Sequence, residues 1–297
     1  MAGKQEKVNS VIQDILSAYS MKTPDDRKKA LLEVLQEIIL YSLFQAGFFS
    51  VAAFYGGSAL RILHQLDRFS EDLDFSLIKK EEGFKFDQYF SSLKQQLLSF
   101  GFEMEVSQKE KKLVSQIQSA FLKGNTLQHF IQIFPGYHFV SEFSHNDSIK
   151  IKMEVDINPP LGATYELKYL LNPLPFAVKG YDLPSLFSGK IHALLCRTWK
   201  KRVKGRDYFD YIWFLSKNIP VNLYHLEQRL RQNHFLSDRG IFTKETLMTL
   251  LNAKFAEVDF EQAKKDIKPF IPSDYDLSLW SSDFFSAITF DWLRVLE

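Results

Sequence analysis

Two short motifs in the first half of the sequence carry residues that could bind a phosphate and a divalent metal ion. Gly56, Gly57 and Ser58 form a turn of small residues, and a helical pattern follows them. Glycines let the backbone approach a bulky anion, and a helix N-terminus offers N–H groups and a partial positive charge. Asp72 lies fourteen residues after Ser58, and Asp74 follows it after one leucine. Together the turn and the paired carboxylates indicate phosphoryl or nucleotidyl transfer.

The aspartate pair falls in a segment where apolar and polar residues alternate, which predicts a half-buried strand over 73–78. Residues two positions apart on a strand share a face, so both carboxylates point the same way. Such a pair can hold two Mg²⁺ ions, one for the attacking hydroxyl and one for the leaving pyrophosphate. An isolated Asp-x-Asp is more often a solvated edge strand. Here, however, the predicted strand 149–157 carries Glu154 and Asp156 on its polar face, and either could be the third acid.

A basic helix is expected after residue 185. Between Lys190 and Arg206 the sequence has seven Lys or Arg residues and no acid. On a helix over 186–204, four of these cations share one narrow face, namely Lys190, Arg197, Lys201 and Lys204. Such a face can bind a triphosphate or an RNA backbone, although a solvated helix face is the more common outcome.

A further pair of acids begins the next predicted helix, 207–217. Asp207 and Asp210 are three positions apart and therefore share one helix face. Either could orient Lys190 or Arg197, or act as a general base, and Asp207 could instead be only a helix cap.

The composition is that of a globular protein large enough for two domains. Of the 297 residues, 45% are apolar and 25% are charged, and the net charge of +1 does not favour any class of partner. The single cysteine, Cys196, excludes an intramolecular disulfide and a Cys-rich zinc site. We interpret Cys196 and His192 as packing residues. With no signal-peptide pattern at the N-terminus, a cytoplasmic location is expected.

One apolar segment, 38–54, approaches the length of a membrane span. It contains Gln45 and Gly47 and leads directly into the Gly-Gly turn. We therefore predict a buried helix followed by a buried strand, and no membrane association.

Strands and helices alternate in the first part of the chain, whereas the last part is helical. Strands are expected over 49–55, 73–78, 102–106, 114–121, 127–134 and 149–157, and helices over 1–22, 25–46, 58–66 and 85–100. Later helices are expected over 186–204, 207–217, 223–232, 243–255, 259–267 and 282–296. The proline-containing stretch 172–184 predicts a boundary, so we expect an α/β domain over 1–178 and a helical domain over 179–297.

Taken together, the motifs resemble those of the nucleotidyltransferase AbiEii/AbiGii toxin family, which is related to the MenT toxins. The matching pieces are Gly56-Gly-Ser-Ala-Leu60, Arg68-x-Ser70-x-Asp72-Leu-Asp74-Phe75, Ile151-Lys-Met-Glu-Val155, Lys190 with Ala193-Leu-Leu-x-Arg197, and Arg206-Asp-Tyr-Phe-Asp210. They cover about 54–215 in order, and together they are far more specific than any one of them. Residues 1–47 and 220–297 match no motif, and substrate choice could depend on them.

The resemblance implies a polymerase-β-like nucleotidyltransferase core, with a mixed sheet flanked by helices, followed by a C-terminal helical bundle domain. It implies a nucleotide-binding set of Gly56, Gly57, Ser58, Arg68, Ser70, Lys190 and Arg197. It also implies two Mg²⁺ ions on Asp72 and Asp74, with Glu154 or Asp156 as the third acid. Lys190 would contact phosphates across a cleft from Asp74, and Asp207 or Asp210 would supply the downstream catalytic acid.

These motifs lead to the hypothesis of a Mg²⁺-dependent enzyme that transfers a nucleoside monophosphate from an NTP to an acceptor hydroxyl. The expected acceptor is tRNA, and the expected context is a type IV-like toxin–antitoxin, or abortive infection, system with a cognate antitoxin as partner. The alternatives are transfer to a small molecule or a protein, or a non-catalytic nucleotide- or RNA-binding module of the same fold. The sequence does not define the NTP, the acceptor or the oligomeric state.

Overall fold

The computed structural model describes residues 11–108, 117–125, 147–197, 203–237 and 240–296. The chain divides into two compact units, each built from more than one segment. The first unit comprises Met1–Leu63, Glu71–Pro159 and Leu167–Gly180. The second unit comprises His64–Ser70, Pro160–Glu166 and Tyr181–Glu297. The chain therefore leaves the first unit for seven residues between the two predicted motifs and then returns to it.

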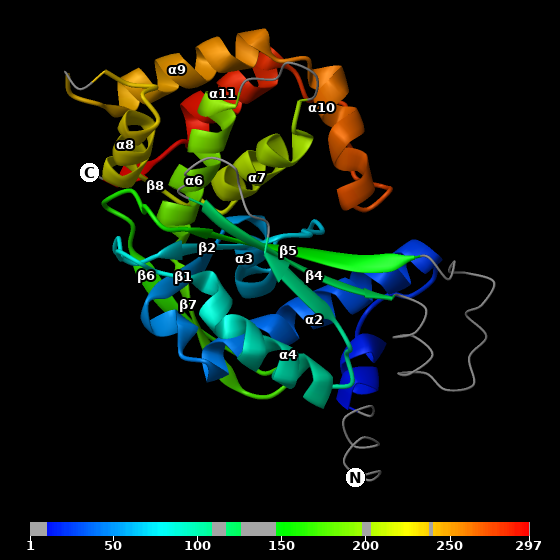
Figure 1. The fold of residues 1–297 in the computed structure, drawn as a ribbon. Coiled ribbons are helices and arrows are strands. Elements are labelled where there is room, and N and C mark those ends of the chain that lie inside the picture. Colours follow the sequence, from blue (N-terminus) through cyan, green and yellow to red (C-terminus); the bar gives the residue numbers. More distant parts are fainter. Residues whose placement is uncertain (1–10, 109–116, 126–146, 198–202, 238–239, 297) are drawn as a thin grey trace. The chain divides into compact units, whose positions relative to one another are not determined.

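The first unit is organised around a seven-stranded sheet (Figure 1). In chain order the strands are β1 Ala52–Tyr55, β2 Leu73–Leu77, β3 Glu105–Gln108, β4 Ile117–Asn125, β5 Ser148–Asp156, β6 Tyr165–Leu170 and β7 Phe176–Tyr181. Across the sheet they follow the order β3-β4-β5-β2-β1-β7-β6. β1 is antiparallel to β2 and β4 is antiparallel to β5, while the pairs β2–β5 and β1–β7 are parallel. The predicted mixed sheet is confirmed.

The helices of the first unit include α2 Pro24–Gln45, α3 Gly56–His64 and α4 Phe90–Ser99, with short 3₁₀ turns at Phe48–Ser50 and Phe86–Tyr89. Residues 11–17 are also helical, and the rest of the helix expected over 1–22 lies partly outside the described residues. α2 begins with a capping box, in which Thr23 and Asp26 each accept the other's backbone N–H in a hydrogen bond. It packs against β5 and α4 and buries most of its length. The apolar segment 38–54 is a buried helix, a turn and a buried strand, as predicted. Within the described part of the chain, no helix is long and apolar enough to cross a membrane.

The second unit is helical. Its helices are α6 Leu183–Cys196, α7 Gly205–Ser216, α8 Leu223–Gln232, α9 Lys244–Glu257, α10 Phe260–Ile267 and α11 Ser282–Trp292. A 3₁₀ turn, Lys268–Phe270, follows α10, and β8 Val221–Asn222 pairs in parallel with β9 Val295–Leu296. α9 and α10 follow the N-caps Thr243 and Asp259, which are the first residues of the helices expected over 243–255 and 259–267.

Aromatic rings fill the core of the second unit. The Phe187 and Phe214 rings stack with centroids 4.4 Å apart, and the Tyr208 and Phe285 rings meet edge-on at 5.3 Å. All four of these side chains are buried. These aromatic contacts hold α6, α7 and α11 together.

The predicted helix over 186–204 is wrong at its C-terminal end. α6 ends at Cys196 because Arg197 adopts an extended conformation, and the Lys254 ammonium group donates a hydrogen bond to the Arg197 carbonyl at 3.0 Å. Lys204 is also extended and precedes α7. Consequently Lys190, Arg197 and Lys204 do not form one helical face, and Lys201 lies outside the described residues.

Two further segments differ from the sequence prediction, and one prediction is not tested. Gly205, expected to end a helix, begins α7, because its N–H donates to Asp266 at 3.0 Å and its missing side chain lets α10 approach. The expected boundary 172–184 contains β7, which the prolines before and after it concealed. The strand expected over 127–134 lies outside the described residues.

Candidate active site

Carboxylates from β2 and β5 lie together on one face of the sheet in the first unit. In the parallel pairing of the two strands, Asp74 is opposite Glu154 and Ser76 is opposite Asp156. Residues paired across neighbouring strands point to the same side, about 4.8 Å apart along the hydrogen-bonding direction. Tyr55, the last residue of β1, is opposite Asp74 on the other side. The register therefore places Asp74 between the end of β1 and Glu154.

The Glu154 carboxylate is held by two neighbours on the same face. Its Oε2 lies 2.7 Å from the Lys152 ammonium group, and its Oε1 accepts a 3.0 Å hydrogen bond from the Ser119 hydroxyl on β4. Asp156 accepts a 2.9 Å hydrogen bond from the Asn158 N–H, which turns the chain after β5. Lys152 shares the polar face of β5 by strand alternation, whereas no local sequence signal indicates Ser119.

The Gly56 turn lies directly against Asp74. Gly56 has φ +84°, a conformation that L side chains rarely adopt, and a Cβ atom there would lie 2.5 Å from Asp74 Oδ2. α3 starts at this residue. The N-terminus of a helix, with its partial positive charge, thus meets a carboxylate of the predicted metal-binding pair.

Ser58 links this turn to the approach of β2. Its side chain is buried, and its hydroxyl donates a short hydrogen bond to the Asp72 carbonyl. Asp72 itself precedes the strand and is exposed. The Ser58 hydroxyl therefore points into the protein and fixes the backbone of Asp72, a role that the motif alone did not suggest.

The residues of this face fit one mode of Mg²⁺ binding. Among the described residues, no group of three or more His, Cys, Asp or Glu side chains could by itself hold a metal ion. Mg²⁺ commonly uses only one or two carboxylates and completes its coordination with water and substrate phosphates. The carboxylates of Asp74 and Glu154 beside a helix N-terminus match that donor set.

Asp210 is the centre of a buried charge cluster in the second unit. Its side chain has no exposed surface. Arg68 binds it through two nitrogens, Nε to Oδ1 at 2.5 Å and Nη2 to Oδ2 at 2.7 Å, and Lys190 Nζ lies 2.7 Å from Oδ2. Burial alone would raise the Asp210 pKa, but the Arg68 and Lys190 cations outweigh burial and hold this pKa below its usual range. Asp210 is therefore a fully paired carboxylate.

The other predicted site residues of the second unit are also paired or buried. Asp207 lies in the first turn of α7, not at its cap, and forms a short ion pair with Arg197. Ser70 is buried, and the Phe69 N–H donates to the Phe270 carbonyl at 2.9 Å. The segment 64–70 thus belongs to the second unit through both its backbone and Arg68.

His192 and Cys196 are packing residues, as expected. Asn233 Nδ2 donates to His192 Nε2 at 2.6 Å, and burial lowers the pKa of this histidine to about 3. Burial raises the Cys196 pKa to about 11. Both side chains are therefore neutral at pH 7, and the thiol is a poor nucleophile.

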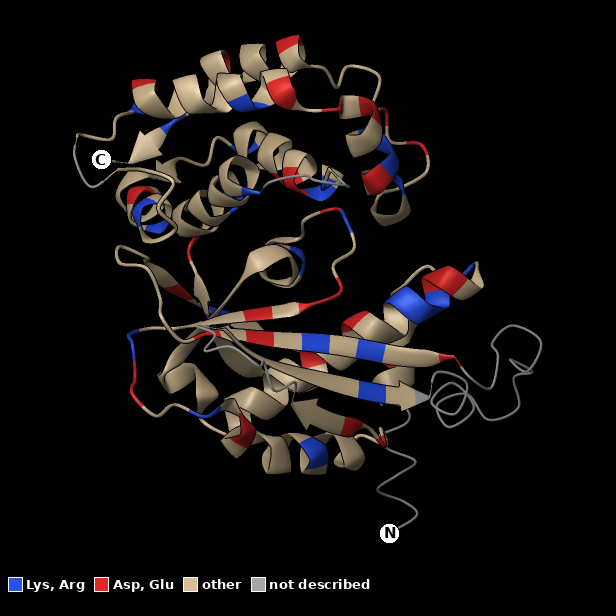
Figure 2. Cartoon of the chain, turned by 45° about the horizontal axis from the view of Figure 1, so that its top comes forward, with Lys and Arg blue, Asp and Glu red and all other residues tan. Residues whose placement is uncertain are grey.

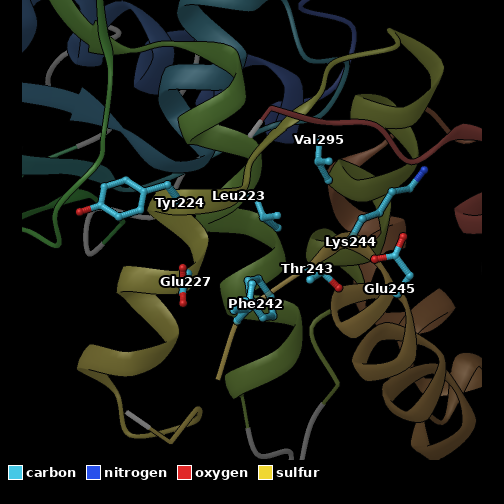
Figure 3. A pocket seen from close by; sticks show the side chains of 9 residues that line it. Leu223, Tyr224, Glu227, Phe242, Thr243, Lys244, Glu245 and Val295 are labelled. Carbon is cyan, nitrogen blue, oxygen red and sulfur yellow. The ribbon is translucent and has the colours of Figure 1, made fainter. Parts of the chain in front are cut away.

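A pocket of about 500 Å³ lies in the second unit, in the region where the sequence showed no motif (Figure 3). It opens between the first turns of α8 and α9 and the strand β9, with Tyr224 and Phe242 in its wall. The charged side chains in its lining are Glu227, Lys244 and Glu245, so the balance is acidic and unsuited to phosphate. None of the predicted site residues lines it.

Comparisons with known proteins identify the family. A family model described as "Nucleotidyl transferase AbiEii toxin, Type IV TA system" matches residues 38–293. The solved structure of JHP933 from Helicobacter pylori is 16% identical, with 88% of this chain and 90% of that chain covered and a TM-score of 0.49. MenT4, a nucleotidyltransferase toxin from Mycobacterium tuberculosis, is 14% identical, with 94% and 93% covered and a TM-score of 0.47.

No curated protein sequence matches the chain. The family match alone spans most of the chain and confirms the resemblance found in the motifs. The chain belongs to the AbiEii family of nucleotidyltransferases, NTP-dependent enzymes that act as the toxins of type IV toxin–antitoxin systems.

Proposed function

We propose that this enzyme transfers a nucleoside monophosphate from an NTP to a hydroxyl of tRNA in a Mg²⁺-dependent reaction, as a toxin restrained by a cognate antitoxin. The observation that carries the proposal is the position of Asp74. This carboxylate lies in register with Glu154 and against the Gly56 turn, where α3 begins. A triphosphate at the α3 N-terminus would therefore lie next to carboxylates that can hold Mg²⁺.

In the first unit, one group of residues would bind the phosphates and another would bind the metal ion. The backbone N–H groups of the first turn of α3, which include those of Gly57 and Ser58, would receive the triphosphate. The missing side chain of Gly56 lets this turn lie against Asp74. Asp72 and Asp74 would hold Mg²⁺. When bound, Mg²⁺ neutralises charge on the phosphates and lowers the pKa of the acceptor hydroxyl.

Glu154 is the better candidate for the third acid. It is paired directly with Asp74, whereas Asp156 is paired with Ser76, two residues farther from the Gly56 turn. Lys152 and Ser119 fix the Glu154 carboxylate on this face. The two candidates can be separated by comparing Glu154→Gln with Asp156→Asn, and we expect the larger loss of transfer from Glu154→Gln.

In the second unit, Lys190 would bind phosphate, and Asp210 would position the Lys190 ammonium group. An ammonium group has three donors, of which the contact with Asp210 occupies one. Asp210 has both oxygens engaged and no exposed surface, so we assign it to positioning and not to proton transfer. Asp207 holds Arg197 in the same manner, and Arg197 remains partly exposed and available to an anion.

The test is a transfer assay with each of the four labelled NTPs, Mg²⁺ and total tRNA. Wild-type protein should label tRNA, chelation of Mg²⁺ should stop the reaction, and Asp74→Ala should lower the rate at least about 1,000-fold, which corresponds to about 4 kcal/mol of transition-state stabilisation. Asp87→Ala, at an exposed aspartate on the turn before α4, is the matched control and should keep wild-type activity.

Transfer that persists in Asp74→Ala would contradict the metal-site assignment. Label that appears on a protein or a small molecule, and not on tRNA, would contradict the acceptor. Expression of the enzyme should arrest growth only when Asp74 is intact, and co-expression of the antitoxin should relieve the arrest.

A further inference from the structure

The sheet face that carries Asp74 and Glu154 continues along β4 and β5 into a basic region. Lys123 of β4 is paired with Lys150 of β5, and Phe121 of β4 is paired with Lys152. We call Phe121, Lys123 and Lys150 the basic strip. Lys123 and Lys150 are exposed and Phe121 is half-buried. Figure 2 shows the change of charge on this sheet, from acidic bands to Lys and Arg bands along neighbouring strands.

Side-chain contacts place the strip and the acids on one face. Side chains alternate along a strand, so Lys150, Lys152 and Glu154 of β5 point the same way. The Lys152–Glu154 ion pair at 2.7 Å confirms this for the second half of the strand. For the first half, the Lys150 ammonium lies 4.6 Å from the centroid of the Phe121 ring. The strip is therefore continuous with the candidate active site.

The strip contains one cross-strand pair of like charges, which the fold offsets only in part. Like charges directly opposite on paired strands destabilise the pairing, and Lys123 and Lys150 are such a pair. The acids of β5 that could offset them, Glu154 and Asp156, lie at the other end of the strand, and the acid facing Lys123 is Glu105 on β3. Two exposed ammonium groups and an aromatic ring are the elements that bind the backbone and a base of a single-stranded nucleic acid.

The distance between the strip and the acids sets a minimum length for a ligand that contacts both. Lys150 precedes Glu154 by four residues, which is about 13 Å along a strand. A small acceptor whose hydroxyl reacts beside Asp74 would not reach the strip. A polynucleotide would reach it within a few nucleotides of its reacting end.

We propose that the basic strip binds the single-stranded end of the RNA acceptor, with phosphates at Lys123 and Lys150 and a base stacked on Phe121. This inference rests on the proposed function, because it assumes that the reaction takes place at Asp74. On binding, Lys150 turns from the Phe121 ring to a phosphate and exposes the ring, since base stacking on an aromatic ring is stronger than an exposed cation–π contact.

The test compares two charge-reversal pairs in the full-length chain. Lys123→Glu with Lys150→Glu alters the strip, and Lys79→Glu with Lys80→Glu changes the same charge at an exposed site after β2. Binding is measured by fluorescence anisotropy with a short fluorescein-labelled single-stranded RNA, and transfer is measured with labelled NTP and total tRNA. Thermal unfolding of each variant shows whether the fold is retained.

The strip variant should bind RNA about 25-fold more weakly near 0.1 M salt and lower the salt dependence by about 1.4, because each lost phosphate contact removes a slope of about 0.7. The KM for tRNA should rise while the KM for NTP stays unchanged. Phe121→Leu should weaken RNA binding about tenfold because the aromatic ring is lost. Phe121→Tyr, which keeps an aromatic ring, should bind RNA as the wild type does. In the Lys79/Lys80 variant, the salt dependence of RNA binding should fall by less than half of the change expected for the strip variant.

Equal RNA binding by the strip variant and the wild type would overturn the inference, as would a wild-type chain that binds no RNA at low salt. If tRNA is labelled but the strip variant has an unchanged KM for tRNA, the inference fails while the proposed function stands. If the strip variant loses RNA binding but no variant, wild type included, transfers nucleotide, the proposed function fails instead. Label on a polypeptide with the same dependence on Lys123 and Lys150 would replace RNA by a protein acceptor.

Discussion

The two units use charged residues in opposite ways. The first unit gathers carboxylates on one face of a sheet, where Asp74 and Glu154 are neighbours in register and Lys152 is the cation bound to Glu154. The second unit gathers two cations, Arg68 and Lys190, around the single carboxylate of Asp210. Both sets were candidates for catalysis in the sequence, and their surroundings differ.

The difference lies in how deeply the carboxylates are buried and in how closely cations surround them. A carboxylate that is fully buried between two cations contributes to stability only as part of the cluster, because any one member left alone would be a buried unpaired charge. Neighbouring carboxylates repel each other and are relieved when a cation binds. The buried cluster of the second unit is typical of a structural support, and the neighbouring carboxylates of the first unit are typical of a site that binds a metal ion.

The largest expected contrast is between Asp210→Ala and Asp74→Ala in stability. Asp210→Ala leaves Arg68 and Lys190 buried without their anion, and we expect a loss of about 3–5 kcal/mol in the free energy of unfolding of the second unit. Asp74→Ala should lower the free energy of unfolding by only about 1 kcal/mol or less, because this side chain is half-buried and not fully enclosed as Asp210 is.

Urea unfolding followed by tryptophan fluorescence measures this contrast directly. All four tryptophans of the sequence fall within 181–297, so fluorescence reports on the second unit, while far-UV circular dichroism reports on both. A stable Asp210→Ala variant with lost transfer activity would show that Asp210 is catalytic and not a support.

A second contrast is the response of the two units to pH. Burial raises the Glu37 pKa to about 7 in the first unit, and Glu37 Oε2 is buried with no hydrogen-bond partner among the described residues. This group favours folding when protonated, so its stabilisation is complete below pH 4.5 and is lost as the pH rises through 7. The change amounts to about 3 kcal/mol. Glu37→Gln should remove the dependence.

In the second unit the sign is reversed. Burial lowers the His225 pKa to about 4, and the His225 ring donates from Nδ1 to the Leu161 carbonyl at 2.8 Å, which fixes the neutral tautomer. The stabilisation is present above pH 6.5 and is lost as the pH falls toward 4, again by about 3 kcal/mol. The fluorescence transition should therefore move to lower urea as the pH falls. A parallel response of both units to pH would contradict this contrast.

The smallest expected effect on stability is the difference between alanine substitutions at two glycines, Gly56 and Gly189. Gly56→Ala places a methyl group 2.5 Å from Asp74 Oδ2 at φ +84°, which should cost about 1–2 kcal/mol and displace the carboxylate, so that transfer falls about tenfold or more. Gly189→Ala on α6 meets no atom within 4 Å and should stabilise the helix by about 0.5–1 kcal/mol. Circular dichroism and the transfer assay on both variants test the pair. Equal activity of the two variants would show that the Gly56 turn does not set the position of Asp74.

Local patterns predicted most elements of this chain. The alternation of apolar and polar residues identified β2 and β5 and their polar face, and the expected starts at 243 and 259 located α9 and α10 within a residue. These signals are readable because strand alternation and capping depend on neighbours in sequence. The end of α6 was not readable, because it depends on Lys254 reaching the Arg197 carbonyl from 57 residues away.

The sequence by itself determined the polar face of β5 that carries Glu154 and Asp156, because spacing along a strand fixes side-chain direction. Only the tertiary structure decided which reactive side chains meet. The register of β2 on β5 made Glu154, and not Asp156, the partner of Asp74. The pairing of Arg68 with Asp210 across 142 residues made both a support within one unit. Such partners are selected by burial and long-range packing, and a local sequence pattern holds no information about either.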